Sequence, residues 1–163
     1  MWQTQNRILM NTDNTHEENS DIEAGVALDT YSVLLVDDDP NFRMIVEFNL
    51  KRLGYSVSAA GSGAEALRIA EQNRDIHLLI TDVAMPGMDG VELARKILRI
   101  QPRMEVLYIS GFPLRSIAGM GVATGSVHFL QKPFPAARLD ERIKAILAGA
   151  YRPCLARVPA LAQ

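Results

Sequence analysis

Short apolar runs alternate with helix-like segments along most of this chain, and this alternation limits the fold more than any other feature. The apolar runs, each short enough for a strand, lie at 33–36, 55–60, 76–81, 106–109 and 127–131. Segments with apolar residues at helical spacing lie at 41–53, 62–73, 89–98, 113–118 and 136–147. Near-continuous apolar strands that alternate with helices form a parallel sheet covered on both faces. The sequence therefore predicts an α/β fold, a doubly wound five-stranded parallel sheet with flavodoxin-like (βα)5 topology.

Sequence signals for helix ends agree with these segments. Ser62 and Glu65 form a capping box, in which the hydroxyl covers a free backbone N–H and the carboxylate reaches back. Asp89 and Glu92 repeat this pattern at the start of the third long helix, and Gly54 ends the first. The helix at 113–118 is expected to be short and weak, because glycines surround it.

Charge and composition divide the chain into three parts. Residues 1–30 contain six acidic residues against one arginine and show little apolar periodicity, so we expect an acidic, mobile N-terminal tail. This tail is either a solvated leader without function or a partner-binding arm. Residues 31–148 are expected to form one domain, and residues 149–163 a short C-terminal tail.

Composition also excludes several classes of function. The formal net charge of −2 argues against general binding to nucleic acid or anionic membranes. The apolar runs are much shorter than the ~20 residues of a membrane span, and residues 1–10 lack the apolar region of a secretory signal. The single cysteine, Cys154, excludes an intrachain disulfide framework and a Cys-based zinc site. We therefore expect a soluble, cytoplasmic protein.

Polar residues stand where the predicted strands end. They are Asp37, Asp38 and Asp39 after the first strand, Asp82 after the third, Ser110 after the fourth and Lys132 after the fifth. Ligands of open α/β sheets bind outside the carboxyl ends of the strands, so these side chains should meet at one edge. Clustered carboxylates without Cys or His suit Mg²⁺. A carboxylate is also a nucleophile toward phosphorus, and an ammonium and a hydroxyl can neutralise the transferred group.

Four motifs at these strand ends resemble the receiver domain of bacterial two-component response regulators: VLLVDDDP, LLITDVAMPGMDG, VLYISG and FLQKPF. The resemblance covers about residues 31–148. The segments SGFP and FLQKPF look most like the corresponding segments of receivers in hybrid histidine kinases. It implies a phosphoprotein of two-component signalling that uses Mg²⁺, with Mn²⁺ as a substitute. It implies no enzyme, only a phosphoacceptor that assists its own phosphorylation and slow dephosphorylation.

The resemblance gives each site residue a role through its place in these motifs. Asp82 matches the phosphoacceptor. Asp37 and Asp38 match the acidic pair that holds Mg²⁺, with Asp38 as the more direct ligand and Asp37 acting partly through water. The backbone carbonyl of Ala84 matches the remaining protein ligand of the metal. Lys132 matches the ammonium that pairs with the phosphoryl group.

Further positions concern switching. Ser110 matches the hydroxyl that contacts the phosphoryl group, and Phe129 matches the aromatic switch residue, although Phe129 also fits a plain core position. The family's Lys–Pro bond is cis, which predicts the same for Lys132–Pro133. Ala84 and Phe112 occupy the two positions whose side chains, in the family, flank the water that hydrolyses the phosphoaspartate. Neither side chain can hydrogen-bond water, which predicts slow self-dephosphorylation.

The implied phosphodonor is a sensor histidine kinase or a histidine phosphotransfer protein. A downstream protein would bind the face built from the fourth helix, fifth strand and fifth helix. A phosphorelay or kinase-control role is favoured over DNA binding, with the protein a monomer or a phosphorylation-dependent homodimer. One alternative is a phosphorylation-independent docking module. The other is a phosphatase resembling the haloacid dehalogenase superfamily. The motif of that superfamily is Asp-x-Asp-x-Thr, and residues 37–41 match its two aspartates but lack its threonine.

Asp39 is expected to differ from its two acidic neighbours. It precedes Pro40 at the first helical position, so its side chain should cap the helix by accepting a backbone N–H. The loop at 85–90, MPGMDG, has a structural role in which proline and glycine set the backbone. We expect it to aim Asp82 into the site.

Overall fold

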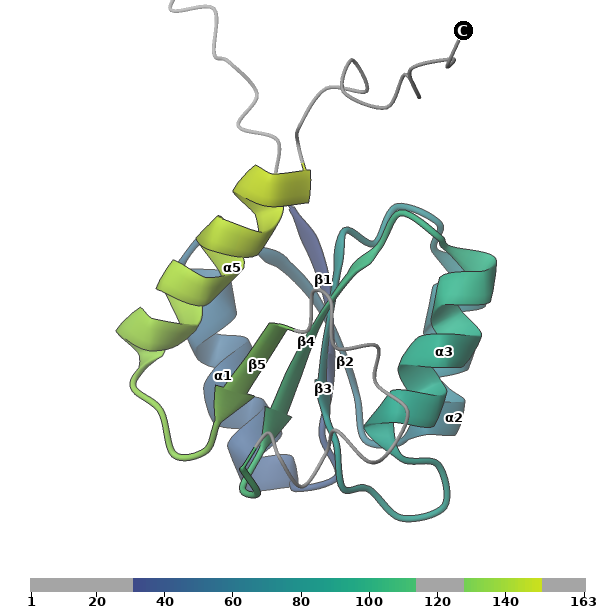
Figure 1. Ribbon diagram of the computed structural model, residues 1–163, viewed down its shortest axis with the longest axis horizontal. Coiled ribbons are helices and arrows are strands. Elements are labelled where there is room, and N and C mark those ends of the chain that lie inside the picture. Colours follow the sequence, from purple (N-terminus) through teal and green to yellow (C-terminus); the bar gives the residue numbers. More distant parts are fainter. Residues whose placement is uncertain (1–30, 114–127, 151–163) are drawn as a thin grey trace, which may run out of the picture.

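The computed structural model describes residues 31–113 and 128–150 of the chain (Figure 1). The strands are β1 (Ser32–Val36), β2 (Ser56–Ala60), β3 (Leu78–Asp82), β4 (Glu105–Ser110) and β5 (His128–Gln131). The helices are α1 (Pro40–Arg52), α2 (Gly63–Gln72), α3 (Gly90–Ile100) and α5 (Ala136–Ala150). The predicted N-terminal tail, residues 151–163 with Cys154, and most of the predicted helix at 113–118 lie outside the described residues.

The strands form one parallel sheet in the order β2-β1-β3-β4-β5. Val36 at the end of β1 pairs with Ala60 of β2 and Thr81 of β3. Ser110 at the end of β4 pairs with Gln131 of β5. The carboxyl ends of the strands therefore lie along one edge, as the sequence predicted, and the doubly wound parallel sheet is confirmed.

Helices cover both faces of the sheet, with α1 and α5 on one side and α2 and α3 on the other (Figure 1). Val33 and Leu35 of β1 pack into the cluster on the α1/α5 side, whereas Leu34 and Val36 pack into the cluster on the α2/α3 side. All four side chains are fully buried. The double coverage explains why β1 is apolar at successive positions rather than alternating.

Side-chain caps fix the starts of α2 and α3. Ser62 Oγ accepts a hydrogen bond from Glu65 N at 3.3 Å, and the Glu65 carboxylate accepts one from the backbone N–H before Ser62 at 2.8 Å. Asp89 Oδ1 accepts from Glu92 N at 2.7 Å. The Glu92 carboxylate pairs with Lys96 at 2.9 Å along the helix surface. The Glu65 carboxylate therefore reaches back to Gly61, the residue before the cap, and not to the Ser62 N–H of a reciprocal capping box, whereas Glu92 is engaged in an ion pair along α3.

Some element boundaries differ from those predicted. Strand β2 begins after Tyr55, because Tyr55 N donates to Leu50 O at 3.1 Å and closes the turn after α1. Strand β3 begins at Leu78 and includes Asp82, because Asp82 still pairs with β4. Helix α5 continues to Ala150, past the helix end predicted at residue 147. The first two differences depend on contacts between elements, which local patterns do not contain.

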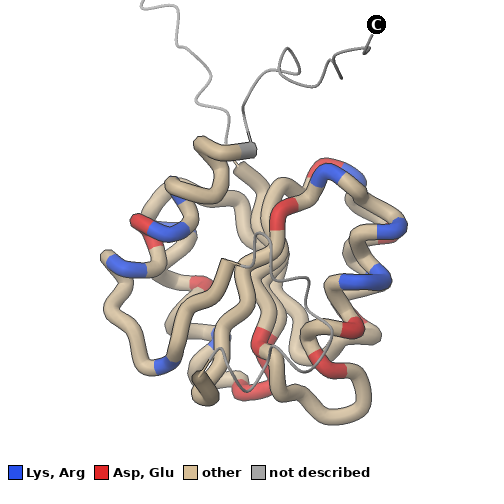
Figure 2. Tube along the Cα trace, viewed as in Figure 1, with Lys and Arg blue, Asp and Glu red and all other residues tan. Residues whose placement is uncertain are grey.

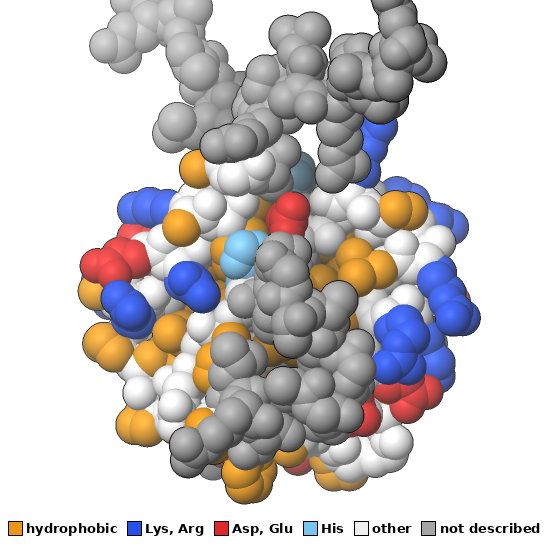
Figure 3. Space-filling model, in the orientation of Figure 1, with side chains coloured by type: hydrophobic (Ala, Val, Ile, Leu, Met, Phe, Trp, Pro, Cys, Tyr) orange, Lys and Arg blue, Asp and Glu red, His pale blue; other side chains and the backbone are white. Residues whose placement is uncertain are grey.

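Charged residues are spread unevenly over this framework. Figure 2 shows Asp and Glu residues gathered at the edge where the strands end and basic residues along α3. Figure 3 shows Lys and Arg side chains gathered on the side of the molecule where Figure 1 draws α3. Arg95, Lys96 and Arg99 of α3 are exposed. Among the described residues, no helix combines the length and apolar character that crossing a membrane requires. The acidic edge is the one at which the sequence predicted a site.

Candidate functional site

Three carboxylates meet at the carboxyl edge of the sheet. Asp37 follows β1 and is fully buried, Asp82 ends β3 and is 9% exposed, and Asp38 is exposed to solvent. One oxygen atom from each of the three carboxylates lies within 4.8 Å of the others. Strands β1 and β3 are neighbours in the sheet, which brings Asp37 and Asp82 together. This set of oxygen ligands fits a hard cation such as Mg²⁺, with the Asp38 side open to water.

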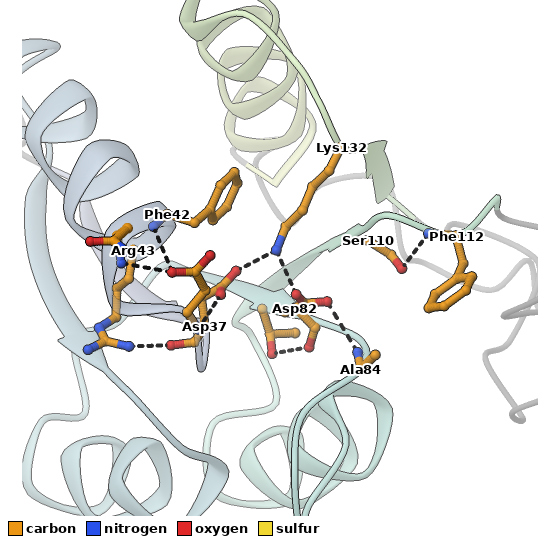
Figure 4. A network of polar contacts seen from close by, with 11 residues as sticks. Asp37, Phe42, Arg43, Asp82, Ala84, Ser110, Phe112 and Lys132 are labelled. Carbon is orange, nitrogen blue, oxygen red and sulfur yellow. Dashed lines mark hydrogen bonds and ion pairs between the residues drawn. The ribbon is translucent and has the colours of Figure 1, made fainter.

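Lys132 bridges the two buried carboxylates (Figure 4). Its Nζ lies 2.7 Å from Asp37 Oδ2 and 2.6 Å from Asp82 Oδ2. The backbone N–H of Lys132 donates to Ser110 O at 2.8 Å, which ties the residue after β5 to the end of β4. The Lys132–Pro133 peptide bond is cis, as predicted. The lysine thus holds together the two acidic side chains that would otherwise repel each other.

Burial and charge shift the titration of this cluster in definite directions. Burial raises the pKa of Asp37, although the hydrogen bond and the charge of Lys132 act in the opposite direction. For Lys132, burial alone lowers the pKa, but the hydrogen bonds and charges of Asp37 and Asp82 outweigh it and the pKa is raised. Lys132 therefore keeps its positive charge well above neutral pH. Asp37 is a buried carboxylate whose ionised form is stabilised by a cation.

Backbone contacts orient Asp82. Its Oδ1 accepts a hydrogen bond from Ala84 N at 3.1 Å, while its Oδ2 faces Lys132. The hydroxyl of Thr81 donates to the Asp82 backbone carbonyl at 2.9 Å. The phosphoacceptor candidate is therefore held on both carboxylate oxygens and on its main chain. The role of the Ala84 backbone carbonyl as a further metal ligand stays a prediction.

The loop after β3 packs directly on the Asp82 backbone. Gly90 N donates to Val83 O at 3.0 Å, and a Cβ added at Gly90 would lie 2.0 Å from Asp82 O. Gly87 has a positive φ of +79°. The sequence predicted that both glycines provide backbone freedom. The structure supports this for Gly87, whereas Gly90 is required because a side chain there would collide with the strand end.

Ser110 is buried at the end of β4, beside the cluster. Its Oγ accepts a hydrogen bond from Phe112 N at 3.1 Å (Figure 4). The Phe112 side chain is 59% exposed. Phe129 is partly buried and packs against the cluster on the α2/α3 side. Its packing fits a core position, and the switch role of Phe129 stays a prediction.

The third aspartate has the separate role that the sequence predicted. Asp39 Oδ1 accepts hydrogen bonds from Asn41 N at 2.9 Å and Phe42 N at 3.3 Å, which makes Asp39 the N-cap of α1. The backbone N–H of Asp39 also donates to Asp37 Oδ1 at 3.0 Å. Two neighbours of the site were not predicted: the Arg43 guanidinium donates to Asp37 O, and the Phe42 ring lies beside Lys132 (Figure 4). Helical spacing had marked Phe42 only as a core residue.

A cavity of about 670 Å³ lies away from this cluster, next to the start of β1 and the chain between α3 and β4. Its lining includes Tyr31, His77, Arg103 and Leu147. None of the predicted site residues lines it. The candidate chemistry at the acidic edge therefore rests on side-chain geometry, and this cavity takes no part in it.

Comparisons with known proteins agree on one family. A sequence model described as the response regulator receiver domain matches residues 33–144. The response regulator receiver protein CpdR of Brucella abortus is 34% identical over 118 residues, which cover 72% of this chain and 98% of CpdR. The C4-dicarboxylate transport transcriptional regulatory protein DctD of Rhizobium meliloti is 38% identical over 109 residues. That match covers 66% of this chain but only 23% of DctD, so the similarity concerns one part of the longer protein.

A solved structure gives the same picture. The crystal structure of the receiver domain from the hybrid histidine kinase CckA matches with a TM-score of 0.62 and 38% sequence identity. The match covers 71% of this chain and 98% of the CckA receiver domain. The similarity to receivers of hybrid kinases, predicted from SGFP and FLQKPF, is thus found in both sequence and fold.

Proposed function

This chain belongs to the response regulator receiver domain family, whose sequence model matches residues 33–144, and on this basis we propose that Asp82 accepts a phosphoryl group from a phosphohistidine donor. The observation that carries the proposal is the contact of Lys132 with both Asp37 and Asp82, beside the exposed Asp38. Phosphorylation and magnesium binding are typical of this family. The cluster contains a nucleophile, oxygen ligands for a metal and a cation for the transferred group.

The transfer forms one P–O bond and breaks one P–N bond. A carboxylate oxygen of Asp82 attacks phosphorus, the electron pair of the P–N bond stays on the donor imidazole, and that nitrogen takes a proton from water. Asp37, Asp38, Asp82 and the Ala84 carbonyl would hold Mg²⁺, which when bound would supply charge neutralisation at the phosphoryl oxygens. Lys132 leaves Asp82 Oδ2 for a phosphoryl oxygen and keeps its bond to Asp37. Lys132 and a bound Mg²⁺ would thus offset most of the negative charge that the phosphoryl group adds to the site.

Switching follows from two contacts that the phosphoryl group would change. The Ser110 hydroxyl accepts from Phe112 N, and turning toward the phosphoryl group would exchange that contact for a hydrogen bond that Ser110 donates. Phe129 lies on β5 next to β4 and would follow Ser110. The downstream partner would bind at β5, α5 and the predicted fourth helix, which lies outside the described residues. A phosphorelay or kinase-control role, in the cytoplasm and without enzymatic turnover, fits this arrangement.

The Asp39 geometry argues against the phosphatase alternative. In an Asp-x-Asp motif both carboxylates serve the reaction, whereas Asp39 caps α1 with its side chain. The docking-module alternative gains no support either, because Lys132 forms ion pairs with both Asp37 and Asp82. Ala84 and Phe112 support slow loss of the phosphoryl group, since neither side chain can orient a water molecule.

Magnesium-dependent labelling tests the proposal. The purified chain is incubated with acetyl phosphate and Mg²⁺, and the added phosphoryl group is detected by intact mass. We expect labelling of the wild type, its loss with a chelator, and its loss in Asp82→Asn. The matched control is Asp75→Asn, an exposed aspartate in the loop before β3, which should label like the wild type. Equal labelling of Asp82→Asn and wild type would refute the assignment.

A further inference from the structure

An aromatic ring lies against the lysine of the acidic cluster. Lys132 Nζ lies 4.0 Å from the centroid of the Phe42 ring, within the range of a cation–π interaction. The same ammonium donates to Asp37 Oδ2 and Asp82 Oδ2 (Figure 4). Two carboxylates and one ring face therefore surround the charged end of a flexible side chain. Such an interaction is strongest where water is excluded, and the Lys132 side chain is only 19% exposed.

The ring is held in place from two directions. Asp39 fixes the first turn of α1 by accepting the Phe42 backbone N–H at 3.3 Å. Phe134 meets the Phe42 ring edge to face, with a centroid separation of 5.8 Å and an interplanar angle of 86°. Phe134 follows Lys132 closely in the chain and packs against the cluster on the α1/α5 side, as Phe42 does. The ring position is thus determined by the helix cap and by the segment after β5.

We propose that Phe42 is a positioning residue for phosphoryl transfer to Asp82: its ring holds the Lys132 ammonium between Asp37 and Asp82, where a phosphoryl oxygen would meet it. This inference rests on the phosphoacceptor function proposed above. The attraction of a cation to a ring face is broad in direction, so Lys132 can exchange Asp82 Oδ2 for a phosphoryl oxygen without losing the ring. Phosphoryl transfer depends mostly on positioning and charge, so freeing the ammonium slows it.

The first test compares substitutions at Phe42 in the acetyl phosphate assay with Mg²⁺. Phe42→Leu keeps an apolar side chain but removes the ring, and we expect the phosphorylation rate constant to fall about tenfold. Phe42→Tyr keeps a ring face and should stay within about threefold of the wild type. Phe48→Leu is the matched control, because Phe48 is an exposed aromatic on the same helix with Arg52 at 5.7 Å. It should leave the rate unchanged.

The second test asks whether Phe42 acts through the ammonium. In a Lys132→Met background, Phe42→Leu should cause no further loss, because the cation that the ring holds is absent. An equal fractional loss in both backgrounds would mean that Phe42 only supports packing, and would overturn the proposal. Retained rate in Phe42→Leu, or no rescue by Phe42→Tyr, would overturn it as well.

A third measurement is independent of phosphorylation. The ring current of Phe42 should shift the NMR signals of the Lys132 ε-methylene protons, and Phe42→Leu should move them toward ordinary lysine values. Absence of this shift in the wild type would contradict the contact itself. If the wild type is not phosphorylated at Asp82 but the shift is present, the proposed function fails while the positioning geometry stands.

Discussion

Replacing Gly90 by alanine should displace Asp82, although Gly90 has no side chain in the site. The added Cβ would lie 2.0 Å from the backbone oxygen of Asp82 and 2.9 Å from both its backbone carbon and the hydroxyl oxygen of Thr81. The closest of these atoms belongs to the main chain at the end of β3, so no flexible side chain can move aside. The clash can be relieved only by shifting the start of α3 or the strand end that carries Asp82.

The cost follows from this geometry. Overpacking typically destabilises a protein by about 1–3 kcal/mol, and a clash with backbone belongs at the upper end of that range. Such a loss lowers the midpoint of thermal unfolding by roughly 10 °C for a domain of this size. A misplacement of about 1 Å at a reacting group costs on the order of a hundredfold in rate, so the phosphorylation rate should fall by a comparable factor.

Alanine variants of two nearby glycines distinguish the steric clash at Gly90 from backbone strain. Gly87 has φ of +79° and nothing within 4 Å of an added Cβ, so Gly87→Ala should cost about 1–2 kcal/mol of stability and keep the labelling rate. Gly111 has neither constraint, so Gly111→Ala should change stability by less than about 0.5 kcal/mol. Urea unfolding and the acetyl phosphate assay measure both quantities. A Gly90→Ala variant that matches Gly111→Ala in stability and rate would refute the reasoning.

Asp39→Ala should lower the free energy of unfolding, measured in urea, by about 0.5–2 kcal/mol because α1 loses its cap. The variant should still bind Mg²⁺ in calorimetry. Loss of Mg²⁺ binding would contradict the division of the three aspartates. In metal-free buffer the free energy of unfolding should fall as pH rises from 3.8 through the raised pKa of Asp37, since the folded state holds a proton that the unfolded chain has released. Asp37→Asn should remove this fall, and an unchanged pH profile would argue against the burial effect. Phosphorylated wild type should lose its phosphoryl group slowly, and Ala84→Asn should shorten its lifetime by orienting water; a wild-type lifetime of only seconds would oppose this.

The sequence was informative wherever the signal was local. The apolar runs were clearest for β1 and β3, because both strands are buried on both faces and their residues do not alternate between apolar and polar. Asp39 could be separated from its two acidic neighbours because an N-cap followed by proline is a pattern within one turn. The convergence of the strand ends followed from the parallel fold itself.

Contacts between distant segments were beyond the reach of such patterns. Phe42 and Lys132 are separated by most of the domain, and only the packing of α1 beside the end of β5 brings the ring to the ammonium. The same holds for Gly90, whose need for a small residue comes from the Asp82 backbone and not from its own φ. The split of the acidic pair into a buried Asp37 and an exposed Asp38 likewise depends on which side of the strand end faces the core.

Mapping the modified residue tests the central claim most directly. After incubation with acetyl phosphate and Mg²⁺, borohydride reduces an aspartyl phosphate to homoserine, and peptide mass spectrometry then identifies its position. We predict homoserine at position 82, in an amount that depends on Mg²⁺ and matches the labelling of the intact chain. Homoserine at Asp37 or Asp38 with none at Asp82 would contradict the account, as would labelling that leaves all three aspartates unchanged.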